Sequence, residues 1–352
     1  MYSVTFRPRI ALAALFIGGL TTCGDAPSLA GPLVAGVPSL ELGGKGTPGL
    51  ATPHLLVSGL EGAFGSTIGP GGALFVAESQ AGRISRIDPQ TGAVTTFASG
   101  LPSNAAVGGG VFDVAFIGQT AYALVSLVTP EVGGGGIDGI YRVDGPNSFT
   151  IVADVGAFNR ANPPETDFFV PTGVPFAVEP FRNGFLVTDG HLNRVLFVTR
   201  DGEIRVLRAF DNIVPTGLTV RGNKVYLAEA GPLPHLPENG KLVAFEAKSA
   251  AATVIATGAR LAVGVQFARG NKLFALSQGV WDGAGAGTPA LPNTGALMQV
   301  NDHGGFTTVV GGLDRPISLQ IIGNTAYVVT LTGEIWVIEN VAEPRFGSTA
   351  SK

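Results

Sequence analysis

Six polar residues recur at corresponding places in this sequence, each at the end of a short and very apolar run. They are Glu78, Ser126, Asp189, Glu229, Ser277 and Thr330. Half of them carry carboxylates and half carry hydroxyls, and ligands that are all oxygen suit a hard cation such as Ca²⁺. If the six residues meet, Glu78, Asp189 and Glu229 would be the metal ligands. The structural alternative is that each acid accepts hydrogen bonds from backbone amides of its own loop.

A second set of candidates follows these positions along the chain. His191 and Asn193 lie in TDGHLNR, His235 lies in PLPHLPE, and Trp281 and Asp282 lie in GVWDG. The two histidines are candidate proton carriers, unless they are simply solvated in their loops. Trp281 is the better candidate for contact with a ligand, because an exposed aromatic residue in a Gly-rich loop is otherwise hard to justify. Alternatively, it pins its own long loop.

Several classes of chemistry are not expected. The sequence has no G-x-S-x-G elbow, no H-E-x-x-H helix, no phosphate-binding G-x-x-x-x-G-K-[ST] loop and no EF-hand loop. With 4 histidines in the whole chain, a His-rich zinc or copper site is not expected either. The net charge is −4 and there is no basic stripe, so nucleic acid is not an expected partner.

A repeated pattern positions the six polar residues. Each repeat has a short apolar strand, a Gly-containing turn and a second, continuously apolar strand that ends at one of the six, as in LTVRGNKVYLAE and LQIIGNTAYVVT. A third strand follows each time, as in RISRID and KLVAFE, and a fourth follows in repeats one to five. The repeat interval is about 50 residues, as in propeller blades. No stretch of the mature chain shows a convincing helical period.

The sixth repeat lacks a fourth strand, and one unpaired fourth strand lies near the start of the chain, in PHLLVSGL (Pro53–Leu60). We therefore predict an all-β fold, a six-bladed β-propeller of four-stranded blades over residues 53–340. In it, Leu55–Ser58 pairs with Gly333–Ile338 and closes the ring. A pair of β-sandwiches is the alternative, but that fold would not require six copies and a displaced strand.

Long connections distinguish one face of the predicted ring. They follow the second strand of repeats two, four and five, and they join successive repeats at Leu101–Gly110 and Gly156–Pro171. In an up-and-down blade these connections lie on the same face as the six polar residues, whereas the short turns lie on the other face. Insertions confined to one face are typical of a binding side.

The N-terminal sequence predicts export. Arg7 and Arg9 precede the apolar run Ile10–Leu20, which is too short to span a membrane, and the only cysteine, Cys23, follows in LTTCGD. Residues 1–23 are therefore interpreted as a signal peptide with Cys23 as the lipidation site of a bacterial lipoprotein; secretory cleavage after Ala30 is the alternative. Residues 24–52 are expected to form a flexible Gly/Pro-rich tether, and residues 341–352 a polar tail. We expect a secreted or periplasmic protein that reaches a membrane only through that anchor.

The blade pattern in PTGLTVRGNKVYLAEAG (Pro215–Gly231) resembles NHL-type propeller repeats. With the Pro-rich stretch Gly231–Gly240 and the terminal GEIWVI, the layout resembles the bacterial ScyD/ScyE family. That resemblance implies a secreted six-bladed propeller. It provides no established catalytic set that could be transferred to this chain.

Two functions fit these observations. The first is a non-catalytic extracytoplasmic binding protein that presents its loop-bearing face to a protein, a glycan or a small ligand and requires no cofactor. The second is a Ca²⁺-dependent propeller enzyme of the gluconolactonase-like lactonase or lyase kind. In that case Glu78, Asp189 and Glu229, with Asn193, would hold the metal, and His191 or His235 would move a proton. A passive structural propeller is a third alternative.

Overall fold

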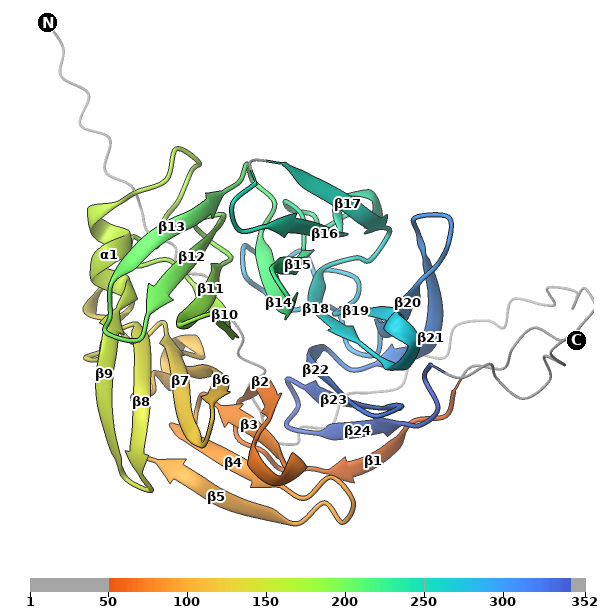
Figure 1. Ribbon diagram of the computed structural model, residues 1–352, viewed down its shortest axis with the longest axis horizontal. Helices are drawn as coiled ribbons and strands as arrows, with labels where there is room; N and C mark the ends of the chain where they lie inside the picture. The colour runs from red at the N-terminus through yellow and green to blue at the C-terminus, as the bar shows by residue number, and fades with distance from the viewer. Residues whose placement is uncertain (1–50, 250, 343–352) are drawn as a thin grey trace, which may run out of the picture.

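The structure is a computed structural model that describes residues 51–249 and 251–342. Six four-stranded antiparallel sheets surround a central channel (Figure 1). The predicted six-bladed β-propeller is therefore confirmed. The proposed signal peptide with Cys23, the proposed tether as far as residue 50 and the tail beyond residue 342 lie outside the described residues.

Each blade runs from an inner strand beside the channel to an outer strand at the rim of the ring (Figure 1). Blade 1 comprises β2 (Ala63–Ile68), β3 (Leu74–Glu78), β4 (Arg83–Ile87) and β5 (Val94–Ser99). Blade 2 comprises β6 (Gly110–Ile117), β7 (Thr120–Ser126), β8 (Gly139–Gly145) and β9 (Ser148–Asp154). Blade 3 comprises β10 (Pro175–Phe181), β11 (Gly184–Asp189), β12 (Arg194–Thr199) and β13 (Ile204–Ala209).

The second half of the ring repeats this order. Blade 4 comprises β14 (Pro215–Arg221), β15 (Lys224–Glu229), β16 (Lys241–Glu246) and β17 (Ala252–Thr257). Blade 5 comprises β18 (Ala262–Phe267), β19 (Leu273–Ser277), β20 (Gly295–Val300) and β21 (Phe306–Leu313). Blade 6 comprises β22 (Pro316–Ile322), β23 (Thr325–Thr330), β24 (Ile335–Ile338) and, as its outer strand, β1 (His54–Val57).

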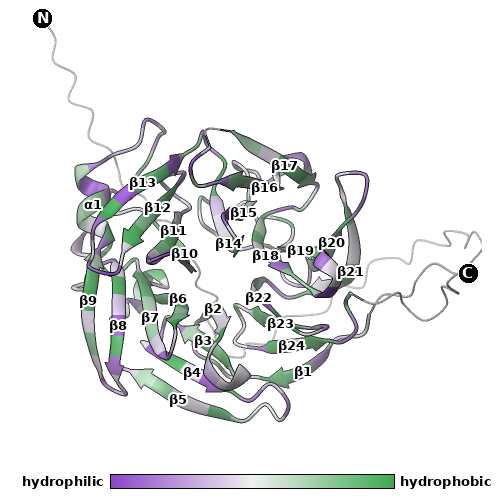
Figure 2. Ribbon diagram, in the orientation of Figure 1, coloured by the Kyte–Doolittle hydropathy of each residue, from purple (hydrophilic) through white to green (hydrophobic). Residues whose placement is uncertain are grey.

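The second strand of each blade is largely buried, because it packs between the sheets of the two neighbouring blades. Every residue of β3 and β11 is buried, and so is every residue of β7 and β23 except the first. A strand covered on both faces is continuously apolar rather than alternating. Figure 2 shows mostly hydrophobic colour on the strands and more hydrophilic colour in the turns and loops.

The first described strand closes the ring. β1 pairs antiparallel with β24, with Val57 opposite Ile335, and the Leu60 amide donates to the Gly333 carbonyl at 3.0 Å. Val57 and Leu60 are also buried in an apolar cluster that extends over blades 5, 6 and 1. In Figure 1 the orange-red β1 lies directly beside the blue β24. The predicted clasp between the two ends of the propeller is therefore confirmed.

One helix departs from the prediction. α1 (Val155–Ala161) lies in the connection between blades 2 and 3, and the Asp154 carboxylate caps it by accepting a hydrogen bond from the Ala157 amide at 2.7 Å. One and a half to two turns give too short a window for a periodic signal. Neither α1 nor any short 3₁₀ turn in the described part of the chain is long and apolar enough to cross a membrane.

The long connections share one face of the ring. They join β7 to β8, β15 to β16 and β19 to β20 within blades, and β5 to β6 and β9 to β10 between blades. Because successive strands alternate in direction, all of these connections emerge on the side where the second strands end. We call this side the loop face, and we call the six polar residues at the ends of the second strands the corner residues.

Candidate functional site

The corner carboxylate of blade 1 is neutralised within its own blade. Glu78 is fully buried, and its two oxygens accept hydrogen bonds from Arg83 Nε at 2.8 Å and Arg83 Nη2 at 2.7 Å. The Ser85 hydroxyl and the Glu61 amide donate to the same carboxylate. This bidentate pair with Arg83 uses both oxygens of the acid.

The corner carboxylate of blade 3 accepts hydrogen bonds mainly from nearby backbone amides. Asp189 is fully buried, and its Oδ1 accepts from the amides of Val174, His191 and Leu192 at 2.9–3.2 Å. Its Oδ2 accepts from Asn159 Nδ2 at 2.6 Å, and Asn159 Oδ1 accepts from Arg194 Nη2 at 2.8 Å. Burial raises the pKa of Asp189, against the opposing effect of these donors.

The remaining corner residues differ in their surroundings. Burial raises the pKa of Glu229 to about 7, with Lys241 and Arg208 acting in the opposite direction. The Ser277 hydroxyl donates to the Arg260 carbonyl, and the Thr330 hydroxyl hydrogen-bonds to that of Thr332 at 2.6 Å. The buried Ser126 hydroxyl finds no partner among the described residues.

The structure does not bring Glu78, Asp189 and Glu229 together as a metal site. Within residues 51–249 and 251–342, no three or more His, Cys, Asp or Glu side chains form a group that could hold a metal ion. Instead, each acid lies directly across from a base on the next strand: Arg83, Arg194 and Lys241 respectively. The sequence carried this signal, because each base is the first residue of its third strand, as in RISRID, RVLFVT and KLVAFE.

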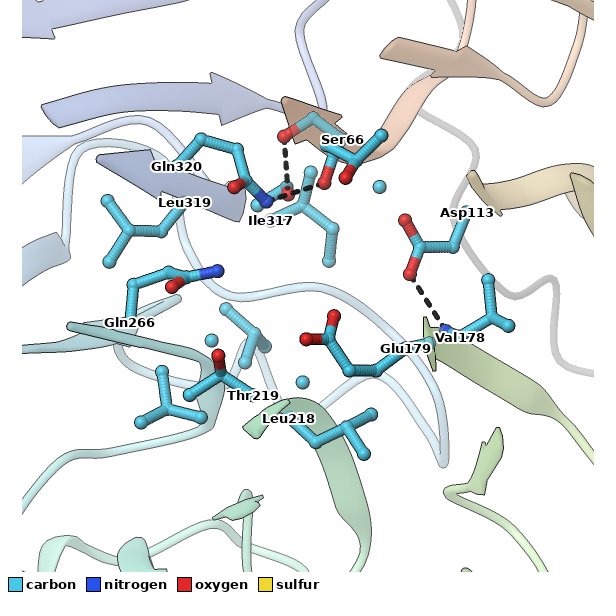
Figure 3. A pocket seen from close by; sticks show the side chains of 18 of the residues that line it. Ser66, Asp113, Val178, Glu179, Leu218, Thr219, Gln266, Ile317, Leu319 and Gln320 are labelled. Atoms are coloured by element: carbon cyan, nitrogen blue, oxygen red, sulfur yellow. Dashed lines mark hydrogen bonds between the residues drawn. The ribbon is translucent and has the colours of Figure 1, made fainter. Parts of the chain in front are cut away.

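The inner strands line a central cavity of about 230 Å³ (Figure 3). The Asp113 carboxylate accepts from the Val178 amide of the next blade at 2.9 Å, and Gln320 Nε2 donates to the Ser66 carbonyl at 2.6 Å. The inner strand of each blade has no neighbouring strand on its channel side, so some of its backbone groups lack a strand partner. These side chains form hydrogen bonds with such groups of neighbouring blades. These polar groups of the channel therefore link neighbouring blades by hydrogen bonds.

Two channel carboxyls titrate far from their ordinary range. Burial raises the pKa of Asp113 to about 7. Burial, with a smaller contribution from the charge of Asp113, raises the pKa of Glu179 to about 8. In Figure 3 both carboxyls point into the cavity. Neither residue was predicted from the sequence, although an acid inside an apolar strand, as in FDVAFIG and FAVEPF, was the available signal.

A larger cavity of about 440 Å³ opens on the loop face beside the channel. The connections of blades 3, 4 and 5 enclose it, together with the segment between blades 2 and 3. Its wall is mainly apolar, with contributions from Val174, Phe176, Val214, Ala230, Leu261 and Val263, and its mouth carries Phe168, Phe169 and Leu233. We call this cavity the loop-face pocket. Phe176 and Val263 also line the channel cavity, so the two cavities are adjacent.

Two predicted candidates line this pocket but are occupied in shaping it. His191 Nε2 accepts from the amides of Phe169 at 2.8 Å and Val170 at 3.1 Å, and burial lowers the pKa of His191 to about 4. Asn193 Oδ1 accepts from the amides of Ile213 and Val214 at 3.0 and 2.9 Å. Both side chains therefore hold loops in place, and His191 has no free lone pair with which to move a proton.

Trp281 and Asp282, two further predicted candidates, hold the blade 5 loop in place by hydrogen bonds. Trp281 Nε1 donates to the Thr288 hydroxyl at 2.8 Å and to the Gly285 carbonyl at 3.2 Å, while the exposed Asp282 accepts from the Ala284 amide and the Thr288 hydroxyl. Neither residue lines the pocket itself, whereas Thr288 does. The structure therefore favours the alternative in which the tryptophan fixes its own loop.

Two buried polar side chains of the pocket keep hydrogen-bonding capacity. Gln278 is 1% exposed and His235 is 7% exposed. Gln278 Oε1 accepts from the Ala290 amide at 2.9 Å, and His235 Nδ1 lies 3.2 Å from the Ala230 carbonyl oxygen. Among the described residues, neither Gln278 Nε2 nor His235 Nε2 has a hydrogen-bond partner. His235 was a candidate on sequence grounds, whereas Gln278, which directly follows the corner residue Ser277, was not.

No protein-family model and no curated protein sequence matches the chain, so the resemblance to the ScyD/ScyE family is not confirmed. The fold is similar to that of a gluconolactonase from Xanthomonas campestris, at 13% identity and a TM-score of 0.57, covering 82% of this chain and 89% of that one. It is also similar to virginiamycin B lyase from Staphylococcus aureus, at 14% identity and a TM-score of 0.51, covering 82% and 98%.

A third similar structure is a PQQ-bound aldose sugar dehydrogenase from Streptomyces coelicolor, at 15% identity and a TM-score of 0.54, covering 83% of this chain and 99% of that one. At such identities the likeness concerns the fold alone. The gluconolactonase and the lyase are six-bladed β-propeller proteins, and this chain shares that architecture with them.

Proposed function

We propose that this protein binds a small, largely apolar ligand in the loop-face pocket and does not transform it. The observation that carries the proposal is the pocket itself, about 440 Å³ of mainly apolar wall on the elaborated face. Ligand pockets commonly have this size and this balance of apolar wall and few polar groups. A glycan is less well suited, because its many hydroxyls would meet few free hydrogen-bonding groups.

The position of the acids supports binding over metal-assisted catalysis. The corner carboxylates face bases of their own blades, and none of them lines the loop-face pocket. A ligand in that pocket would therefore meet no carboxylate cluster able to polarise it through a metal.

Binding can be tested with Nile red, an uncharged fluorescent probe of apolar cavities. Leu233 at the pocket mouth is 43% exposed, and Leu55 on β1 is 46% exposed and remote from the pocket, so the two form a matched pair. We expect Leu233→Asp to weaken Nile red binding about tenfold, because half of a leucine's apolar surface is lost from the contact. Leu55→Asp should leave it unchanged. Equal affinities in both variants would refute the assignment of the pocket.

A second candidate function is a lyase or lactonase activity, and one observation favours it. His235 is a pocket histidine whose Nε2 has no hydrogen-bond partner in residues 51–249 and 251–342, as a general base requires. Turnover of a lactone series with and without Ca²⁺, abolished by His235→Ala, would establish this activity in place of passive binding.

We propose that binding takes place outside the cytoplasm, in a secreted or periplasmic protein whose Cys23 is lipidated. The support is the N-terminal sequence alone, with its basic start, apolar run and following cysteine. Labelling of the full chain with radioactive palmitate should be lost in Cys23→Ala. Unlabelled wild-type protein that begins at Gly31 would show ordinary secretion instead.

A further inference from the structure

The polar groups of the loop-face pocket show which ligand chemistry it can accept, once those already used by the fold are set aside. His191 Nε2 and Asn193 Oδ1 already accept hydrogen bonds from backbone amides. The Thr216 hydroxyl donates to the carbonyls of Ala228 and Ala262. These groups have little capacity left for a ligand. Gln278 and His235 are the buried side chains that do, and each is at least nine-tenths buried.

The amide of Gln278 presents a donor to the pocket. Its oxygen and nitrogen are distinguished by the backbone, because the Ala290 amide donates to one end of the group at 2.9 Å and only an oxygen can accept there. The other end must be the NH₂ group, and its hydrogens have no acceptor among the described residues. An acceptor on a ligand would pair with this donor, and that hydrogen bond would stabilise the complex.

The imidazole of His235 presents an acceptor. A carbonyl oxygen can only accept, so the nitrogen that lies 3.2 Å from the Ala230 carbonyl must carry a proton. Burial lowers the pKa of His235, against the opposing effect of the Ala230 and Gly231 carbonyls, and the ring therefore carries one proton at neutral pH. Nε2 then holds a lone pair, and no described residue donates to it.

The charge of the pocket excludes one class of ligand. Among the described residues no lysine or arginine lines it, and the exposed Asp167 at the mouth is the one lining residue with a formal charge. A carboxylate or phosphate taken into this cavity would lose its water without gaining a counterion, which is strongly unfavourable.

We infer that the loop-face pocket recognises an uncharged ligand with an aromatic or alicyclic body and an amide-type group, whose carbonyl meets Gln278 Nε2 and whose N–H meets His235 Nε2. This inference rests on the proposed binding function and narrows it to one ligand class. The apolar walls of Phe176, Val214 and Val263 receive the body.

A set of probes with one common body tests the inference on the full chain. N-methyl-2-naphthamide supplies both an acceptor and a donor, methyl 2-naphthoate supplies only an acceptor, and 2-naphthoate carries a negative charge. Measured by displacement of Nile red at neutral pH, the amide should bind about three- to tenfold more tightly than the ester, the effect of one hydrogen bond. The acid should bind at least about a hundredfold more weakly.

Two variants connect these preferences to the named side chains. His235→Phe should bring the ratio of amide to ester affinity close to one, because the ester makes no bond to His235. Gln278→Glu keeps an oxygen for the Ala290 amide but removes the donor, so it should weaken the amide and the ester alike. A purely structural role of His235 would weaken both probes and leave their ratio unchanged.

The outcomes separate the inference from the proposed function. Equal binding of the amide, ester and acid, tighter binding of the acid, or no binding of the amide would overturn the inference. The proposed function would survive each of these results as long as Leu233→Asp still weakens Nile red binding. If Leu233→Asp has no effect, the proposed function fails as well.

Discussion

Asp189→Asn should destabilise the protein strongly, although the substitution removes only one charge and adds no bulk. The carboxylate is fully buried. Its Oδ1 accepts hydrogen bonds from three backbone amides, and its Oδ2 accepts one from Asn159 Nδ2. An asparagine has one acceptor oxygen in place of two. In one orientation its NH₂ group faces Asn159 Nδ2, and in the other it faces the backbone amides, so buried donors oppose each other in both.

The size of the effect follows from two losses. A buried donor left without an acceptor costs about 1–3 kcal/mol. In addition, Arg194 is 3% exposed and reaches Asp189 through Asn159, and removing one member of a buried charged pair costs about 3–5 kcal/mol. Because the two losses overlap, we expect the free energy of unfolding to fall by about 3–5 kcal/mol.

Urea unfolding followed by tryptophan fluorescence measures this change, since Trp281 and Trp336 lie in different blades. Asp201→Asn is the matched control, an exposed acid in the turn between β12 and β13, and should change the free energy by less than about 0.5 kcal/mol. A loss below about 1 kcal/mol for Asp189→Asn would refute the argument. Calcium binding by the wild type that this variant abolished would restore the metal hypothesis.

Three further outcomes are expected. Leu60→Ala at the ring closure should lower the free energy of unfolding by about 2–4 kcal/mol, whereas the exposed Leu55→Ala should have little effect in the same urea assay. Because the pKa values of Asp113 and Glu179 are raised to about 7 and 8, the folded chain holds protons that the unfolded chain releases near pH 4. Stability should therefore fall as the pH rises from about 4 to 8, and Asp113→Asn should flatten this slope in a pH series. Trp281→Phe removes the indole donor from the blade 5 loop and should make that loop more sensitive to limited proteolysis, with the melting temperature nearly unchanged.

The architecture was predictable because its signals are repeated and physically redundant. Six continuously apolar second strands follow from burial between blades, and the missing fourth strand of the last repeat identified the clasp before any contact was known. α1 gave no comparable signal. The Asp154 cap stabilises the first turn of this seven-residue helix. The buried Asn159 then connects the helix to blade 3 through a hydrogen bond to Asp189.

The candidate site was less predictable, because sequence shows which groups are present but not which of them are already in use. Glu78 and Asp189 have the chemistry of metal ligands, yet Arg83 and a set of amide donors use their oxygens. His191 and His235 look equivalent as loop histidines. One accepts two amides with Nε2, while the other faces a carbonyl with Nδ1 and keeps Nε2 free.

Free hydrogen-bonding capacity is therefore the property that separates Gln278 and His235 from the corner acids Glu78 and Asp189. A fold gains nothing from leaving a buried donor or acceptor unpaired, since each one costs free energy. Glu78 satisfies that requirement through Arg83, and Asp189 does so through Asn159 and nearby backbone amides. Gln278 Nε2 and His235 Nε2 have no hydrogen-bond partner among the described residues, and both residues line the loop-face pocket. A ligand in the loop-face pocket would pair with both groups, so we expect a ligand, rather than a metal at the corners, to decide the protein's function.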